Sequence, residues 1–442
     1  MTNIALIVLD TLRKDAFDKH FDWLPGTRFE NAWSTSHWTV PAHGSLFTGK
    51  YASEVGIFAS HQQFNCDDEL LAETLSDAGF RTRMFSANPN ISPTFSADRG
   101  FDMFRGSWRL EGIEQNILNW DKFIAKTRSM GPERFLLALK EVLFGDYDTI
   151  PSLKQGAKLK LRNKKIGENA VDDGALTAHN LVKNTAFDEN EFLFMNLMEA
   201  HTPYYPPDGY GTGDSVELQG LNATFDEPED DPDEIRRAYD DCVRYLSDMY
   251  ANIFNELKSD FDVIITMSDH GELLGEHDAW EHMYGLYPEL TNVPLSVYFG
   301  ENEQTTVQQS VSILDIYQTI LGAADIDPPE GTRGRDLTED LDDREYLVEY
   351  HGLHDRNYIA LENRGYEDIE FLQTKLNGIA TDSYYGFETF DGFEEHGTSP
   401  YSSPHDRLSE LTGELDYAEV SDSRTDDLSE EVIEQLEDLG YA

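Results

Sequence analysis

Acidic and imidazole side chains follow three of the most apolar segments of the chain, at points where buried strands would end. Asp10 follows the letters NIALIVL, Asp269 and His270 follow FDVIITMS, and His201 follows EFLFMNLMEA. Ligands bind at the carboxyl ends of the strands of an open α/β sheet, so we expect these side chains to gather at one edge. Carboxylate oxygens combined with imidazole suit Mn²⁺, Zn²⁺ or Mg²⁺. The pattern therefore predicts a metal site at that edge.

Thr39 is a candidate nucleophile in the segment STSHWTVPAHGSLFTGKY, where a helical pattern begins. Pro41 fits the first turn of a helix, where its missing N–H group is not needed. A hydroxyl group at a helix N-terminus lies beside free N–H groups and the positive end of the helix dipole, which favour an anionic ester. Bound to a metal, such a hydroxyl is a nucleophile with a lowered pKa. The local sequence alone favours the commoner role of threonine at this place, which is to cap the helix.

The apolar runs alternate with helical patterns along most of the chain. Continuous apolar runs are typical of parallel strands that are covered on both faces, and strands alternating with helices indicate a doubly wound, mainly parallel sheet. The strands expected are Asn3–Asp10, Arg81–Asn88, Glu191–Ala200, Phe261–Asp269 and Pro294–Gly300. The helices expected are Asp67–Phe80, Pro232–Lys258 and Ser312–Ala324. We predict an α/β catalytic domain over residues 1–324 that is flanked by helices.

Two regions depart from this pattern. Residues 108–180 show no strand and are locally basic, which indicates a helical insertion in the catalytic domain. The run Lys154–Lys165 within it is either a solvated surface or part of a lid that attracts an anionic substrate. From residue 325 to 442 the chain is richer in Gly, Pro and Asp, and we interpret this part as a small α+β subdomain packed on the first domain. It would end with the helix SEEVIEQLEDLGYA.

The charge of the chain is strongly negative and is spread over its whole length. Asp and Glu number 85 against 34 Lys and Arg, which gives a net charge of −51. Such a surface makes nucleic-acid binding improbable and is typical of a halophilic cytosolic protein, which would lose its fold on transfer to ~0.1 M salt. The N-terminus lacks the basic region of a signal peptide, and no run approaches the roughly 18 apolar residues of a membrane span. Cys66 and Cys242 form no C-x-x-C pair, so a thiolate site is not expected. We expect a cytoplasmic protein without stable membrane insertion.

The pattern Thr39-x-Pro41-x-His43, followed by Thr48-Gly49-Lys50, resembles the sulfatase signature, which reads Cys or Ser, x-Pro-x-Arg, and later Thr-Gly-Arg. Further blocks resemble that family in the same order, and they read VLDTLRKD, FMNLMEAHTPYYPP and MSDHGELLGEHDAWEHMYG. The resemblance covers most of the chain apart from about residues 108–180. It implies an alkaline-phosphatase-like fold and a divalent metal cofactor, which would be Mn, Mg, Ca or Zn.

The resemblance also implies a role for individual residues. Asp10, Asp269 and His270 match metal ligands, and Thr39 matches the nucleophile that also faces the metal. His201 and His282 match residues that contact the ester oxygens or assist the leaving group, although His277 and Glu281 are plausible in place of His282. His43 stands at the position of the signature Arg, and Lys50 matches the basic residue that supports the surroundings of the nucleophile.

The departures from the signature matter for the chemistry. Sulfatases proper oxidise the first signature residue to formylglycine, and Thr39 cannot form that aldehyde because its hydroxyl carbon carries a methyl group. Thr11 stands in place of a second metal carboxylate. A threonine nucleophile with Asp and His metal ligands resembles the phosphodiesterase, phosphonate-hydrolase and phosphoglycerol-transferase branches of the superfamily. We therefore expect no formylglycine.

We therefore expect a metal-dependent hydrolase that cleaves sulfate or phosphate mono- or diesters through a covalent Thr39 intermediate. The substrate would be an anionic ester that is either a small molecule or linked to a glycan or a lipid. One alternative is a transferase that moves a phosphoryl-linked group to glycan or lipid head groups. Another is a degenerate family member that only binds ligands.

Overall fold

The computed structural model describes residues 2–107, 109–110, 174–216, 218, 220–300 and 303–419, together with isolated residues between 137 and 153. Most of the expected insertion at 108–180 lies outside the described residues. The basic run Lys154–Lys165 and the expected terminal helix lie outside them entirely. Within the described ranges, no helix has both the length and the apolar composition that a bilayer crossing requires.

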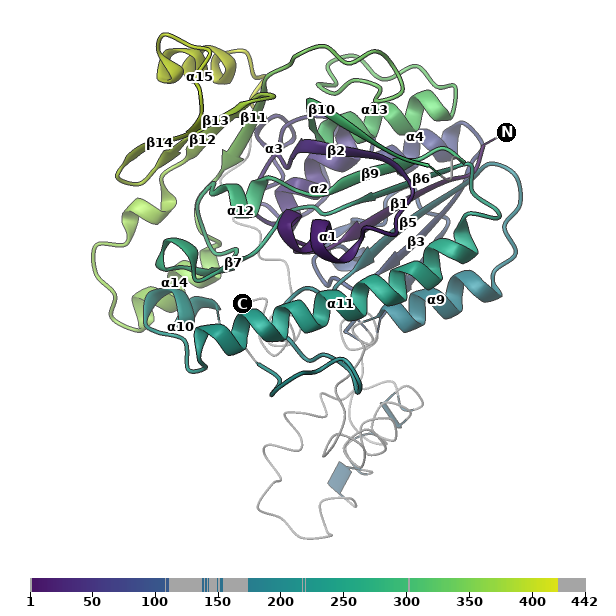
Figure 1. The fold of residues 1–442 in the computed structure, drawn as a ribbon, viewed down its shortest axis with the longest axis horizontal. Helices are drawn as coiled ribbons and strands as arrows, with labels where there is room; N and C mark the ends of the chain where they lie inside the picture. The colour runs from purple at the N-terminus through teal and green to yellow at the C-terminus, as the bar shows by residue number, and fades with distance from the viewer. Residues whose placement is uncertain are drawn as a thin grey trace.

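An eight-stranded sheet forms the centre of the molecule (Figure 1). Its strands, in the order in which they lie across the sheet, are β10 (Gln304–Ser312), β2 (Gly26–Trp33), β9 (Leu295–Tyr298), β6 (Val263–Met267), β1 (Ile4–Leu9), β5 (Glu191–Leu197), β3 (Arg81–Ser86) and β4 (Met103–Gly106). Neighbouring strands run parallel except where β9 pairs antiparallel with β2 and β6. The predicted doubly wound, mainly parallel sheet is confirmed.

Strand β1 shows why the sequence is apolar without interruption at this place. All six of its residues are fully buried. Ile4, Leu6 and Val8 pack into one hydrophobic core, and the alternate residues of the strand pack into a second core on the other face. A strand with two covered faces has no position for a polar side chain until it ends, and it ends immediately before Asp10.

Helices cover both faces of the sheet (Figure 1). One face carries α1 (Lys14–His20), α9 (Ala175–Asn184) and α11 (Pro232–Leu257), and the other carries α2 (Thr39–Thr48), α4 (Leu71–Asp77) and α13 (Ile313–Ala323). Short elements in the connections are α3 (Ala52–Val55), α10 (Gly220–Phe225), α12 (Pro288–Thr291), β7 (Leu273–Leu274) and β8 (Trp280–Glu281).

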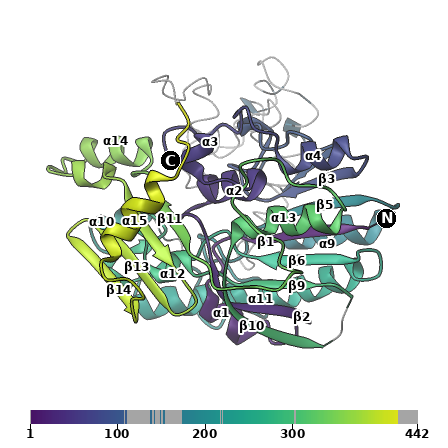
Figure 2. The same cartoon turned by 90° about the horizontal axis from the view of Figure 1, so that it is seen from above.

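A small antiparallel sheet forms the C-terminal subdomain and lies beside the central sheet (Figure 2). It contains β11 (Tyr346–Tyr350), β12 (Leu376–Ala380), β13 (Tyr384–Thr389) and β14 (Gly392–Gly397), with helices α14 (Asp355–Asn363) and α15 (Pro404–Gly413). The Tyr385 ring stacks on Trp33 at the end of β2 with 4.3 Å between ring centroids, and the backbone N–H of Glu349 donates to the Thr35 carbonyl oxygen. The subdomain therefore packs against the segment that leads into α2. Its expected boundary at residue 324 stays a prediction.

Candidate active site

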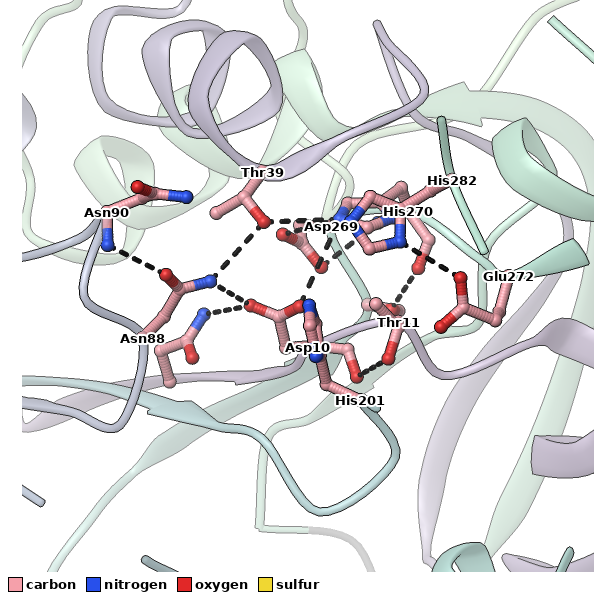
Figure 3. Close-up of polar contacts among 12 residues, drawn as sticks. Asp10, Thr11, Thr39, Asn88, Asn90, His201, Asp269, His270, Glu272 and His282 are labelled. Atoms are coloured by element: carbon pink, nitrogen blue, oxygen red, sulfur yellow. Dashed lines mark hydrogen bonds and ion pairs between the residues drawn. The ribbon is translucent and has the colours of Figure 1, made fainter. Parts of the chain in front are cut away.

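Asp10, Asp269 and His270 meet at the carboxyl edge of the central sheet (Figure 3). Asp10 directly follows β1, and the other two residues follow the neighbouring strand β6. All three side chains are buried, and one potential ligand atom from each lies within 4.8 Å of the others. Asp10 Oδ1 and Asp269 Oδ2 have no hydrogen-bond partner among the described residues, and His270 Nε2 lies 4.0 and 3.5 Å from these two oxygens. These atoms are the ones that a cation would contact.

Hydrogen bonds on the outer side of each ligand fix its orientation. His270 Nδ1–H donates to the Gly271 carbonyl oxygen at 2.9 Å, so the lone pair of Nε2 faces the carboxylates. Asp10 Oδ2 accepts hydrogen bonds from Asn88 Nδ2 at 2.8 Å and from Asn196 Nδ2 at 3.0 Å, which leaves Oδ1 directed into the cluster. The outer partners thus select which atom of each side chain is available to a metal.

The electrostatics of the cluster favour a positive charge at its centre. Burial raises the pKa of Asp10, although the hydrogen bonds from Asn88 and Asn196 oppose this effect. Burial and the nearby charge of Asp10 raise the pKa of Asp269 well above its ordinary value. Burial, together with the charge of His282, lowers the pKa of His270 and keeps its imidazole neutral. Two carboxylates that repel each other and a neutral imidazole fit a divalent cation.

Thr39 directs its hydroxyl group toward this cluster instead of capping a helix. It is the first residue of α2, and the N-cap position is occupied by Trp38, whose side chain makes no capping hydrogen bond. Asn88 Nδ2 donates to Thr39 Oγ1 at 3.3 Å, and Thr39 Oγ1 lies 3.2 Å from His270 Nε2 (Figure 3). Because Nδ1 of His270 carries the proton, the threonine hydroxyl donates to Nε2. The capping role that local sequence favours is therefore not the one this side chain performs.

His43 lies one turn further along α2, behind Thr39. Its Nδ1–H donates to the Thr39 carbonyl oxygen at 2.9 Å and lies 3.6 Å from Asp269 Oδ2. Its ring packs edge-on against Phe47 and Phe194, and burial lowers its pKa to about 4. A neutral, enclosed imidazole of this kind positions the first turn of α2 and does not face the pocket.

Lys50 is not brought to the cluster. It lies two residues beyond Thr48, the last residue of α2, which at a rise of about 1.5 Å per residue is roughly 14 Å along the helix from Thr39. Its Nζ forms an ion pair with Asp68 Oδ1 at 2.5 Å. The structure therefore places this lysine in a partly buried ion pair beyond the opposite end of the helix that begins at Thr39.

His201 and His282 stand together on the other side of the cluster. The His282 ring lies 4.5 Å from the ring of His270 and 5.3 Å from the ring of His201, measured between centroids. His282 Nδ1–H donates to Glu272 Oε1 at 2.9 Å; burial opposes protonation, but the Glu272 carboxylate raises the pKa of His282 to about 9. Burial and the charge of His282 lower the pKa of His201, whose Nδ1–H donates to the Thr202 carbonyl oxygen. One imidazole of the pair is thus charged at neutral pH and the other is neutral.

A pocket of about 60 Å³ opens between these groups. Its wall is formed by His37, Trp38, Thr39, Asn90, His201, Glu281, His282, Met283, Gly352, His354 and Asn357. The last three residues come from the C-terminal subdomain, so both parts of the chain form the pocket. His277, one of the alternatives to His282, instead stacks on Tyr287 and pairs with Glu289 outside this wall.

The match to a family model decides the classification of the chain. The model described as Sulfatase matches residues 4–326, which is well over half of the sequence. This chain belongs to the sulfatase family. It is 23% identical over 357 residues to YidJ, an uncharacterized sulfatase of Escherichia coli K12, and 24% identical over 371 residues to an ulvan-active sulfatase of Formosa agariphila.

The matched regions cover 74% and 78% of this chain but 66% and 63% of those two proteins, so the chain spans slightly less than two thirds of these relatives. The structure of a phosphonate monoester hydrolase from Silicibacter pomeroyi is similar, with a TM-score of 0.61, 15% identity, and coverage of 93% of this chain and 94% of that one. This last comparison shows a shared fold.

The structure of this sulfatase-family member adds residues that sequence reasoning missed. Asn88 and Asn196 donate hydrogen bonds to Asp10, and Asn88 also donates one to Thr39 Oγ1. Because the expected ligands were carboxylate and imidazole side chains, the sequence did not single out these two amides. Asn88 could have been found by its position, because it lies two residues beyond the end of β3, at the same carboxyl edge as Asp10. Thr11, which replaces the second carboxylate, has a left-handed φ of 56° and donates its hydroxyl to the Asp10 carbonyl oxygen. It is therefore turned toward the backbone.

Proposed function

We propose that this chain is a metal-dependent hydrolase of sulfate, phosphate or phosphonate esters in which Thr39 is the nucleophile. The observation that carries this proposal is the position of Thr39 Oγ1, which is held by Asn88 Nδ2 beside His270 Nε2 and the buried carboxylates. The intact cluster also argues against a degenerate member that only binds ligands.

Asp10, Asp269 and His270 would hold the divalent cation. When bound, it supplies the positive charge that offsets the two carboxylates, polarises the ester and lowers the pKa of the Thr39 hydroxyl. Asn88 keeps Oγ1 directed at the ester through its amide, and His43 holds the backbone of the same residue. The geometry prepares the oxygen for attack before the substrate arrives.

The reaction would proceed in two displacements. Thr39 Oγ1 gives its proton to a solvent water molecule and attacks the sulfur or phosphorus atom, and the bond to the leaving oxygen breaks while His282 donates a proton to that oxygen. The Glu272 carboxylate behind His282 stabilises the charged imidazole and fixes its ring. Water then cleaves the covalent sulfo- or phospho-threonine and restores the hydroxyl group. An acceptor alcohol in place of water would make the same site a transferase, so the products of the second step distinguish the two reactions.

The comparisons support both kinds of ester as candidates. One relative is named an ulvan-active sulfatase, and a structure with the same fold is a phosphonate monoester hydrolase. Thr39 itself supports direct attack by a hydroxyl group, because it cannot be converted to formylglycine. The nucleophile is therefore better supported than the identity of the acid in the ester.

The test is a panel of nitrophenyl sulfate, phosphate, phosphodiester and phosphonate esters, assayed at high KCl with Mn²⁺, Mg²⁺, Ca²⁺ and Zn²⁺ separately. For the ester that the protein hydrolyses, Thr39→Ala should lower kcat/KM by at least about 10⁴-fold and leave the metal content unchanged. Thr39→Ser keeps the hydroxyl group and should retain most of the activity. Acid-quenched wild-type enzyme should carry the transferred group on the peptide that contains Thr39, and near-normal turnover by Thr39→Ala would end the proposal.

A further inference from the structure

Glu281 is a buried carboxyl group beside the proposed acid that the reaction scheme does not use. It is the last residue of β8, directly before His282, and its side chain is only 5% exposed. It lines the same pocket as Thr39 and His201, and its Oε1 has no hydrogen-bond partner among the described residues. Leaving a buried acceptor without a partner is unfavourable, so such groups are rare unless a ligand satisfies them.

Three other buried carboxyl groups outside the metal cluster have their partners within the protein. Asp315 accepts hydrogen bonds from Tyr346 and from two backbone N–H groups. Glu191 forms a two-point pair with Arg83, and Glu272 contacts both His282 and Tyr204. Glu281 differs from these three because its Oε1 has no hydrogen-bond partner among the described residues and the residue lines a pocket.

The surrounding backbone holds Glu281 in this unfavourable place. Its φ is 58°, in the left-handed region that residues other than glycine rarely adopt. Gly220 leaves the space for the carboxyl group, since a Cβ atom at that position would lie 2.1 Å from Glu281 Oε2. Burial and the charge of Glu272 raise the pKa of Glu281 to about 8, so at neutral pH the group can both donate and accept a hydrogen bond. These features preorganise a hydrogen-bonding group at the pocket wall.

The size of the pocket determines what this group would meet. A volume of about 60 Å³ holds only a few water molecules, so a group bound beside Thr39 lies close to the other residues that line the pocket. Because His282 would protonate the leaving oxygen, the alcohol part of the ester would lie near Glu281, which precedes His282 and lines the same pocket. Asn90 and Asn357 line this pocket as well.

We propose that Glu281 is a specificity-determining residue that hydrogen-bonds a hydroxyl group on the carbon next to the ester oxygen, so that the site prefers esters of polyhydroxy alcohols. This inference rests on the proposed function, because it assumes that the ester is cleaved beside Thr39. The proposed role of Glu281 concerns the alcohol part of the ester, which the metal cluster does not select.

The test compares two esters that differ in one hydroxyl group, the 2-hydroxyethyl ester and the ethyl ester of whichever acid the panel identifies. The measured quantity is selectivity, defined as the ratio of the two kcat/KM values. Wild-type enzyme should prefer the 2-hydroxyethyl ester, and Glu281→Ala should lower this selectivity about tenfold, the size expected for one lost hydrogen bond in a buried site. The difference in intrinsic reactivity between the esters cancels when variants are compared.

Gly220→Ala provides a second variant that leaves Glu281 chemically unchanged. The added methyl group must displace the carboxyl group, so selectivity should fall in the same direction. Glu289→Ala is the matched control, because that glutamate pairs with His277 outside the pocket, and it should leave selectivity at the wild-type value. Circular dichroism verifies that each variant folds.

Two outcomes would overturn the inference. Selectivity could remain at the wild-type value in both Glu281→Ala and Gly220→Ala, or Glu281→Ala could lower kcat/KM equally for the two esters, as a catalytic or purely structural residue would. A calorimetric titration of both esters into Thr39→Ala, with and without Glu281→Ala, measures the same preference without turnover. Binding without preference for the hydroxyl group, or no binding, would also refute it, whereas preferential binding by a wild-type protein that hydrolyses neither ester would refute only the proposed function.

Discussion

The two sides of the site, called here the sheet wall and the loop wall, are built from different kinds of structure. On the sheet wall, Asp10, Asn88 and Asp269 lie within two residues of the ends of strands of the central sheet, and hydrogen bonds from Asn88 and Asn196 fix Asp10. On the other wall, the segment from residue 276 to 283 includes left-handed backbone at His277, Asp278 and Glu281, and the C-terminal subdomain adds further side chains. A sheet edge holds reacting groups rigidly, whereas loops can change without disturbing the core.

This difference indicates a division of tasks between the walls. Changes on the sheet wall should impair the reaction of every ester, because they affect the nucleophile and the metal. Changes on the loop wall should have effects that depend on the leaving group. This division would be wrong if substitutions on both walls lowered the activity toward all esters equally.

The largest effect is expected from Asp269→Asn on the sheet wall. Removing one of two carboxylates should release the metal and lower kcat/KM for every ester by at least about a thousandfold, because the metal contributes several kcal/mol to such reactions. Metal analysis after dialysis and steady-state kinetics measure the two effects. Asp240→Asn, which alters a surface carboxylate paired with Lys19, is the control. Full metal content together with full activity in Asp269→Asn would remove this residue from the site.

The His282→Gln variant should show most clearly that the effect of a change on the loop wall depends on the leaving group. Without the proton donor, kcat/KM for an alkyl ester should fall by about 100-fold or more, since general acids contribute factors of this order. A nitrophenyl ester should lose much less, because its leaving group departs without protonation. His277→Gln, on the same loop but outside the pocket, is the matched control. An equal loss for both esters would assign His282 to binding or structure.

Asn88→Ala tests the sheet wall at a residue that does not need to touch the metal. The variant loses the hydrogen bonds to Asp10 Oδ2 and Thr39 Oγ1, and one hydrogen bond to a charged group corresponds to about tenfold in rate. The loss should appear in kcat and be the same for alkyl and nitrophenyl esters. Asn252→Ala, on the exposed side of α11, is the control. A loss confined to one leaving group would contradict the division between the walls.

The sequence indicated the sheet wall far better than the loop wall. Asp10 and Asp269 could be predicted because strands buried on both faces are rich in apolar residues, and polar residues at or just beyond their ends lie at the carboxyl edge. Asn88 lies at the same edge just beyond β3, but β3 reads RTRMFS and gives a weaker signal. Strands β2 and β10 were not predicted, because several of their residues are exposed or half-buried and no apolar run marks them.

The loop wall depends on contacts that no local pattern encodes. His354 and Asn357 reach the pocket only because the C-terminal subdomain docks near Trp38, more than three hundred residues earlier in the chain. The environment of Glu281 depends on Gly220 in the same way. Lys50 shows the converse problem, since a motif match gave it a role near the nucleophile although a complete helix separates them.

The smallest effect is expected from Asn357→Ala, which tests whether the C-terminal subdomain contributes to recognition. Asn357 lies on α14 at the pocket edge, and its Nδ2 contacts only the Met283 sulfur atom at 3.8 Å among the side chains described. An amide without a strong internal partner can turn to a substrate hydroxyl group, and one neutral hydrogen bond is worth about 0.5–1.5 kcal/mol. KM for the 2-hydroxyethyl ester should therefore rise severalfold while kcat changes little.

Asn363→Ala, at the other end of α14 and exposed to solvent, is the matched control. Among the described residues, Asn357 and the metal cluster share no hydrogen-bond partner. The effect of Asn357→Ala on kcat/KM should therefore add to the effect of Asn88→Ala in the double variant. Additivity would show that the leaving-group wall acts independently of the sheet edge that holds the nucleophile. A large coupling between Asn357 and Asn88 would mean instead that docking of the C-terminal subdomain also sets the position of Thr39, and the two walls would then be one unit.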